Sequence, residues 1–286
     1  MIKLIASDMD GTLLNSDHMI SEENLKAIRK AQEMGRHFTI ITGRDYDGVK
    51  SYLKEHDLRC ECILNNGAEY RDIDGNIIES VYMNKESVKI VFDILNEAGL
   101  YIQFMTNNGS YVTNKESDKR AIIDRFMLFN PKMSESEVIE FVEKFQKERG
   151  IKFIDNIHEI LESNIEILKI LTFHNDEELI KKLKDKLKAN TSDLAVVSTF
   201  SNDIEISHIE AQKGLILAKA IKKMGIDKSE VIVLGDSFND YSMFTEFENS
   251  YAMGNAIPEI KKIAKYITDS NNNDGVAKAI YKALEI

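Results

Sequence analysis

Short apolar runs without polar alternation are the feature of this sequence that most constrains its fold. Three of them are LIA at residues 4–6, FTII at 38–41 and VIVLG at 231–235. Such runs are typical of strands that are buried on both faces of a parallel sheet. Amphipathic helical stretches separate them, and the first of these has Ser21 as its N-cap and Gly35 at its end. The alternation predicts βαβ units and an α/β fold with a mostly parallel sheet.

The rhythm of the sequence changes near Met83 and resumes after about His208. Segments between these positions alternate apolar and polar residues, as in LYIQFMT, EILKILTFH, LAVVSTF and DIEIS. Alternation predicts a sheet with one face exposed to water. We therefore predict an α/β core formed by residues 1–82 and 209–286, interrupted by an α+β insertion at 83–208.

The charge balance argues against a protein that binds nucleic acids. The 286 residues include 37 Lys and Arg against 48 Asp and Glu, which gives a formal net charge of -11. Nucleic-acid phosphates are bound through clustered Lys and Arg side chains. We expect no nucleic-acid partner, and an anionic substrate would need local positive charge or a metal ion.

Two cysteines, Cys60 and Cys62, have the spacing that places both on one face of a strand. They are too few to form a structural zinc site, so we expect two buried thiols in a reducing cytoplasm. No apolar run reaches the roughly 18 residues of a membrane span. The first residues also meet acids too early for a signal peptide. These observations predict a cytoplasmic protein without a membrane partner, either a monomer or a small homo-oligomer.

Asp8 and Asp10 follow the first apolar run, one residue apart, and Gly-Thr comes directly after them. Open α/β sheets bind ligands outside the carboxyl ends of their strands, which is where this pair would lie. Two carboxylates there repel each other unless a cation joins them or one takes up a proton. The pair therefore predicts a metal ion, a raised pKa, or both.

A second Asp-x-Asp-Gly pattern, at Asp72, Asp74 and Gly75, shows that the residues alone do not mark a site. It lies between two short strand-like runs, where Asp-Gly is a common pair in tight hairpin turns. We predict that Asp72 and Asp74 are turn residues. The buried strand before Asp8 distinguishes the two copies.

A second concentration of polar residues follows the run VIVLG. Asp236 ends that predicted strand, and Asn239 and Asp240 lie on the turn into a helix. Another interpretation takes Ser237 as the nucleophile of a serine esterase, which would need a base that is usually His. No His follows His208, although a base from earlier in the chain remains possible.

Two further residues are compatible with phosphate binding. Thr42 offers a hydroxyl and exposed amides at a strand end. Lys213, at the opening of a helix, could bring positive charge and is equally typical of a solvated surface lysine. Walker and GxGxxG fingerprints do not occur, an EF-hand would need further acidic ligands, and an aspartic protease would need a second Asp half-site.

Taken in order, DMDGTLL, TGR, the Lys213 segment and GDSFND resemble the four motifs of the haloacid dehalogenase superfamily. The resemblance is strongest to its Cof-like sugar-phosphatase branch. LNNGA at 64–68 and the segment at 251–280 extend the likeness over nearly the whole predicted core. The resemblance implies a Rossmann-like core with an inserted α+β cap domain at 83–208.

The same resemblance implies a role for each matching residue. Asp8 would be the nucleophile that attacks phosphorus, and Asp10 the acid/base that protonates the leaving oxygen and then activates water. Phosphoryl oxygens would be held by Thr42 and Lys213, helped by the backbone amides of Met9, Gly11 and Gly43. Magnesium would be bound by Asp8, the backbone carbonyl of Asp10, and Asp236, with Asn239 and Asp240 supporting its waters or the phosphate.

The expected function is a magnesium-dependent phosphatase that hydrolyses small phosphorylated metabolites, with sugar phosphates most favoured, through an aspartyl-phosphate intermediate. The second Asp of the first motif is absent from the superfamily's dehalogenases, so Asp10 favours phosphoryl chemistry. Two alternatives stay open at this point: a phosphomutase, and a catalytically idle metabolite-binding regulator of the same fold.

Overall fold

The computed structural model describes residues 1–113, 116–130, 132–198 and 201–285. The chain divides into two compact units. The core unit consists of Met1–Val81 and Glu210–Ile286, and the inserted unit is Tyr82–Ile209. Each has its own hydrophobic clusters and its own sheet, so each is described by itself.

The core unit is built on an eight-stranded, mostly parallel sheet. Its strand order is β14-β13-β12-β1-β2-β3-β4-β5. The five pairings from β14 to β3 are parallel, and only β3 with β4 and β4 with β5 are antiparallel. The strands are β1 (Leu4–Ser7), β2 (His37–Ile41), β3 (Glu61–Leu64), β4 (Glu69–Arg71), β5 (Ile77–Ser80), β12 (Val231–Gly235), β13 (Ser250–Ala252) and β14 (Tyr266–Ile267). The predicted α/β class with a mostly parallel sheet is confirmed.

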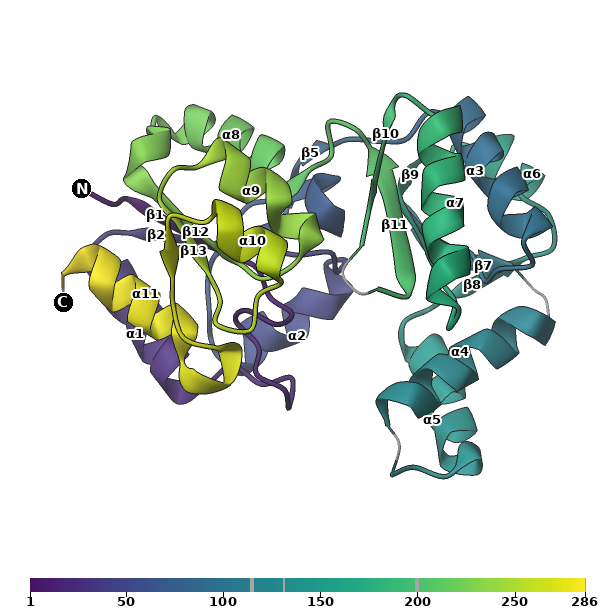
Figure 1. Cartoon of the computed structure of the whole chain (residues 1–286), viewed down its shortest axis with the longest axis horizontal. Helices are drawn as coiled ribbons and strands as arrows, with labels where there is room; N and C mark the ends of the chain where they lie inside the picture. Colours follow the sequence, from purple (N-terminus) through teal and green to yellow (C-terminus); the bar gives the residue numbers. More distant parts are fainter. Residues whose placement is uncertain (114–115, 131, 199–200, 286) are drawn as a thin grey trace. The chain divides into compact units, whose positions relative to one another are not determined.

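Helices cover both faces of this sheet (Figure 1). On one side α1 packs against α11, and on the other α8 packs against α9. The helices are α1 (Glu22–Glu33), α2 (Asp47–Glu55), α8 (Lys213–Met224), α9 (Tyr241–Glu246), α10 (Pro258–Ile263) and α11 (Gly275–Leu284). Ser21 caps α1 as predicted, because its hydroxyl accepts a hydrogen bond from the backbone of Asn24.

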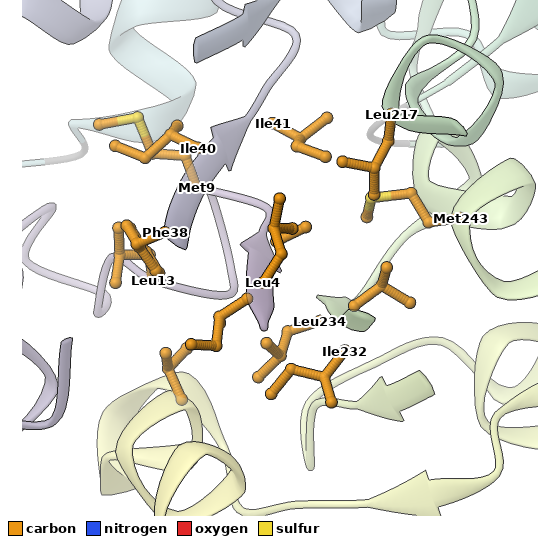
Figure 2. Packing of buried hydrophobic residues seen from close by; sticks show 14 of the residues in the cluster. Leu4, Met9, Leu13, Phe38, Ile40, Ile41, Leu217, Ile232, Leu234 and Met243 are labelled. Atoms are coloured by element: carbon orange, nitrogen blue, oxygen red, sulfur yellow. The ribbon is translucent and has the colours of Figure 1, made fainter. Parts of the chain in front are cut away.

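Apolar side chains from neighbouring strands meet between these layers. Figure 2 shows buried members of this core, among them Leu4 of β1, Phe38 of β2, Ile232 and Leu234 of β12, and Leu217 of α8. All of them are at most 2% exposed. Because β1 is buried on both faces, its sequence needs no polar alternation, and the chain can change to polar residues only where the strand ends.

The second Asp-x-Asp-Gly copy lies in the β4–β5 hairpin, as predicted. The carboxylate of Asp72 accepts hydrogen bonds from the backbone of Asp74 and Asn76, and Gly75 takes a φ of 83°. Asp74 is exposed and pairs with Arg59. Both Asp side chains therefore belong to the turn.

The inserted unit contains a six-stranded sheet in the order β10-β11-β9-β6-β7-β8. Helices α3 and α7 contact each other, and their apolar residues join those of the strands in one cluster. The strands are β6 (Gln103–Thr106), β7 (Gly109–Thr113), β8 (Lys152–Ile154), β9 (Ile167–Phe173), β10 (Leu194–Val197) and β11 (Asp203–His208). The helices are α3 (Lys85–Glu97), α4 (Glu116–Phe129), α5 (Glu135–Glu148), α6 (His158–Leu161) and α7 (Glu177–Asn190).

The expected water-exposed face of this sheet is wrong for β9 and β11. Lys169 and Glu205, which sit at polar positions of the alternating pattern, are 2% and 6% exposed. Their side chains form an ion pair at 3.1 Å, and this pairing makes the burial of the two charges tolerable. Residues 199 and 200 of the predicted LAVVSTF strand lie outside the described residues.

Cys60 and Cys62 are free and buried at β3, in agreement with the expectation of two buried thiols. Within the described ranges, the structure contains no helix with the length and apolar character that a membrane span requires.

Candidate active site

Two strand ends bring the first and second acidic segments together. β1 and β12 are parallel neighbours, with Ser7 in register with Leu234, so both chains leave the sheet at the same edge. The backbone N–H of Asp8 donates to the carbonyl of Leu234 at 3.0 Å. Asp8 and Asp236 are therefore adjacent in space although more than 200 residues separate them in sequence.

Three carboxylates gather at this edge: Asp8, Asp236 and Asp240. Each offers one oxygen, and the three oxygens lie within 4.8 Å of one another. We call these residues the three-acid cluster. Carboxylate oxygens at this spacing suit a hard divalent cation, and the cluster could hold a metal ion.

Lys213, the first residue of α8, lies against the three-acid cluster. Its ammonium group is 2.5 Å from Oδ1 of Asp8 and 2.6 Å from Oδ1 of Asp240, and its side chain is fully buried. Burial alone would lower the pKa of Lys213, but the two carboxylates raise it above its ordinary value. Three carboxylates and one ammonium leave two negative charges, which one divalent cation would balance.

The close spacing and burial of these acids raise the pKa values of Asp8 and Asp236. Burial, followed by the charge of Asp240, raises the pKa of Asp8 well above its usual range, although Lys213 opposes the shift. The same two causes raise the pKa of Asp236 to about 7, against a hydrogen bond from Thr12. The charges that raise the pKa of Asp8 are those of Asp240 and Asp236, whereas the sequence pattern pairs Asp8 with Asp10.

Asp240 also shapes the loop that carries it. Its Oδ2 accepts hydrogen bonds from the backbone of Asp236 and Ser237 at 2.8 and 3.1 Å. The hydroxyl of Ser237 in turn accepts from the backbone of Asp240, which gives this serine a capping role in the turn. A Cβ at Gly235 would lie 2.6 Å from Asp240 Oδ2, so only glycine leaves room for the carboxylate.

Asp10 lies at the edge of the site and is bound by Arg44. Nε and Nη2 of Arg44 donate to the two carboxylate oxygens at 2.8 and 2.5 Å. Burial alone would lower the pKa of Arg44, but the hydrogen bonds and charge of Asp10 raise it. Arg44 stands in the TGR motif, yet nothing in the sequence marks it as the partner of Asp10.

The remaining predicted phosphate ligands lie in the loops that follow β1 and β2. Thr42 is buried, and its hydroxyl accepts from the backbone of Arg44 at 3.2 Å. The side chain of Met9 belongs to the hydrophobic core (Figure 2), which leaves only its backbone for a ligand. Gly11 has a φ of 77°, and a Cβ there would lie 2.6 Å from Asp236. Gly43 follows Thr42 in the same loop.

Asn239 lies beside a turn that contains none of the predicted site residues. Its Nδ2 is 3.4 Å from Oδ1 of Asn66, in the segment Asn65–Gly67. That segment takes three positive φ values in a row, 51°, 59° and 105°, and its backbone donates to the carbonyls of Arg44 and Thr42. The LNNGA motif is the signal that could have identified it.

Two more supporting residues come from distant segments. Thr12 donates its hydroxyl to Asp236 Oδ1 at 2.8 Å. Asn255 donates to the carbonyl of Gly11 at 2.8 Å and accepts from the backbone of Asn271. These bonds fix the loop after β1 from the C-terminal part of the chain.

Comparisons with known proteins find similar chains of one family. A family model described as haloacid dehalogenase-like hydrolase matches residues 5–280. In Bacillus subtilis (strain 168), the 5-amino-6-(5-phospho-D-ribitylamino)uracil phosphatase YwtE is 33% identical, covering 99% of this chain and 98% of the relative. Phosphatase YwpJ of the same organism is 32% identical, covering 96% and 98%. A solved structure of a haloacid dehalogenase-like hydrolase from B. subtilis has a TM-score of 0.84 at 31% identity, covering 98% and 99%.

Proposed function

Because the chain belongs to the haloacid dehalogenase-like hydrolase family, we propose that it hydrolyses small phosphorylated metabolites with magnesium, sugar phosphates being the leading substrates. The family resemblance drawn from the sequence motifs is confirmed by the family model and by the relatives. Relatives named phosphatases also support the class of enzyme, a phosphoric monoester hydrolase. The magnesium ion, the substrate class and the roles of single residues are our additions.

The buried contact between Asp8 and Lys213 carries the proposal. An Asp oxygen 2.5 Å from a fully buried ammonium sits where an incoming phosphoryl group would meet both a nucleophile and a positive charge. Charge stabilisation in a site closed to water is the largest contribution to many enzymatic accelerations. Phosphate monoesters need such help because their uncatalysed hydrolysis is among the slowest known.

The residues account for both halves of a two-step hydrolysis. In the first half, an Asp8 oxygen bonds to phosphorus, the bond from phosphorus to the alcohol oxygen breaks, and the proton of Asp10 moves to that oxygen. In the second half, Asp10 takes a proton from water as the water oxygen attacks phosphorus. Inorganic phosphate leaves and Asp8 is regenerated as a carboxylate. Lys213 and Thr42 hold the phosphoryl oxygens in both halves.

The donor set fits magnesium. Asp8, Asp236 and the backbone carbonyl of Asp10 would supply oxygen ligands, and Asn239 and Asp240 would hold waters or phosphate. Magnesium in proteins usually keeps several of its waters and binds through one or two carboxylates. Two carboxylates and one carbonyl would leave room for those waters. When bound, it supplies the positive charge that offsets the repulsion between Asp8 and the phosphate.

The proposed acid role of Asp10 favours substrates that are phosphate esters of alcohols. Alkoxides are poor leaving groups, so a positioned acid matters most for esters of alcohols. The name of YwtE specifies a phosphorylated ribityl chain, which is an alkyl phosphate of this type. Sugar phosphates share that chemistry. We assign selection among them to residues 83–208, as the cap domain.

Phosphate release from a panel of sugar phosphates, sugar-alcohol phosphates and nucleotides, with magnesium or with a chelator, tests the proposal. We expect metal-dependent turnover that falls by at least about 1,000-fold in Asp8→Asn. Asp74→Asn is the matched control, because it changes the other Asp-x-Asp-Gly copy, and it should behave as the wild type. Wild-type turnover by Asp8→Asn would refute the assigned nucleophile.

A further inference from the structure

Arg44 binds the one acid of the site that lies outside the three-acid cluster. In the described part of the chain, the acids that lie close enough together to share a metal ion are those of the three-acid cluster. The Asp10 carboxylate is not one of them. Both oxygens of Asp10 instead accept hydrogen bonds from Arg44. The Asp10 side chain is 32% exposed, whereas that of Asp8 is 5% exposed. The more exposed acid is thus bound by Arg44, whereas Lys213 contacts Asp8 and Asp240.

The guanidinium of Arg44 is itself fixed in place. Its Nη1 donates to the carbonyl of Gly48 at 3.3 Å, and its central carbon lies 5.4 Å from the ring centroid of Tyr52. The backbone of Arg44 is bound to the hydroxyl of Thr42. A planar guanidinium held at two points on a fixed backbone presents a fork of fixed direction, and a two-point bond to it leaves a carboxylate little freedom to rotate.

We propose that Arg44 is a positioning residue, which holds the Asp10 carboxylate apart from the three-acid cluster and directed to the oxygen that leaves phosphorus. The inference rests on the proposed phosphatase function. Without Arg44, the partly exposed Asp10 side chain is free to rotate into water or toward a cation bound at the cluster. In either position it cannot pass its proton to the leaving oxygen, because a proton donor must lie within hydrogen-bond reach.

The leaving group of the substrate separates this role from a general structural one. As the phosphorus–oxygen bond of an alkyl phosphate breaks, the alcohol oxygen must receive the Asp10 proton. The nitrophenolate of p-nitrophenyl phosphate departs as a stable anion and needs none. The ratio kcat/KM reports the first half of the reaction, so it isolates this proton transfer from the later use of Asp10 as a base.

The experiment compares kcat/KM of Arg44→Met for p-nitrophenyl phosphate and for the best alkyl phosphate of the panel. We expect a loss of about 30-fold to 100-fold for the alkyl ester and less than about 3-fold for the aryl ester, given the usual size of general-acid contributions. Arg44→Lys keeps the charge but not the fork, and it should recover only part of the loss. Arg59→Met, which breaks an exposed Arg–Asp pair elsewhere in the core unit, is the control and should change neither value.

A double-mutant cycle adds the second test. Because Arg44 acts through Asp10, adding Arg44→Met to Asp10→Asn should cause no further loss for the alkyl ester. Equal losses for both esters, or additive losses in the cycle, would overturn the positioning role and leave the phosphatase function standing. Absence of turnover of both esters by the wild type would refute the phosphatase function, and the positioning role with it. Thermal unfolding of each variant verifies that the fold is intact.

Discussion

Replacing Lys213 by Met tests the electrostatic account of the site most directly. Methionine has a similar shape and volume, so it retains the packing of the lysine stem and removes the ammonium group. The side chain is fully buried and contacts Asp8 and Asp240 at 2.5 and 2.6 Å. The substitution therefore leaves both carboxylates without their cation.

The size of the effect can be worked from these distances. At an effective dielectric constant of about 20, unit charges 2.5 Å apart attract by about 6–7 kcal/mol. Part of this attraction is offset because the variant no longer buries an ammonium group. Removing one partner of a buried ion pair typically costs about 3–5 kcal/mol, and we expect a loss of that size in the unfolding free energy of the core unit in chelator.

Magnesium should reduce this deficit. Without the ammonium, the three-acid cluster has one more uncompensated negative charge, so a divalent cation should bind it more tightly. A ligand that binds only the folded state stabilises it in proportion to its affinity. The gap in unfolding free energy between Lys213→Met and wild type should therefore be smaller at saturating magnesium than in chelator.

Urea denaturation followed by far-ultraviolet circular dichroism measures the effect, because the chain contains no tryptophan for fluorescence. Lys219→Met is the control on the same helix. Its side chain is 44% exposed and pairs only at the surface with Glu210 and Glu79, so we expect a change within about 0.5 kcal/mol. A loss below about 1 kcal/mol for Lys213→Met in chelator, or the same deficit with and without magnesium, would refute the reasoning.

Two further predictions concern packing and pH. A Cβ at Gly214 would lie 2.1 Å from the carbonyl oxygen of Ser242, so Gly214→Ala should lower the unfolding free energy by about 1–3 kcal/mol despite the better helix propensity of Ala, and an unchanged thermal midpoint would contradict this. Burial would raise the pKa of Asp193, but hydrogen bonds from Ser87, Asn84 and its own backbone, together with the charge of His208, outweigh it and leave that pKa lowered. Its stabilisation is therefore present above the unfolded-state pKa of about 3.9 and is lost as pH falls through the folded-state value. Asp193→Asn should cost up to about 1 kcal/mol at pH 7 and progressively less below about pH 4, and a deficit independent of pH in urea denaturation would show that the carboxylate charge is not involved.

Strand ends are the part of the site that sequence reasoning could predict. Asp8 and Asp236 each follow an uninterrupted apolar run, and parallel pairing of β1 with β12 places both at one edge. The prediction works because a strand buried on both faces can change to polar residues only at its end. Lys213 is different, since its position at a helix start is equally compatible with a solvated lysine. Only the two facing carboxylates explain why it is buried.

Partners that are distant in sequence could not be predicted. Arg44 and Asp10 are 34 residues apart, and Asn255 and Gly11 are 244 residues apart. No local period or cap connects such pairs, because the contact depends on which strands become neighbours and how far each loop extends. The wrong prediction in the inserted unit has a similar cause. Alternation on β9 shows that Lys169 faces one side of the sheet, but not that an opposite charge on β11 meets it there.

The position of the inserted unit explains why the site must be assembled from both parts of the chain. Asp8 and Thr42 precede the insertion and Lys213 and Asp236 follow it, so the site exists only after β12 has paired with β1. The entropic cost of closing a loop rises only slowly with its length. An insertion with a hydrophobic core of its own is therefore compatible with this pairing. The acids lie on β1, β12 and their loops, so side chains of the insertion can differ without altering the acids. The assignment of substrate choice to residues 83–208 requires this division.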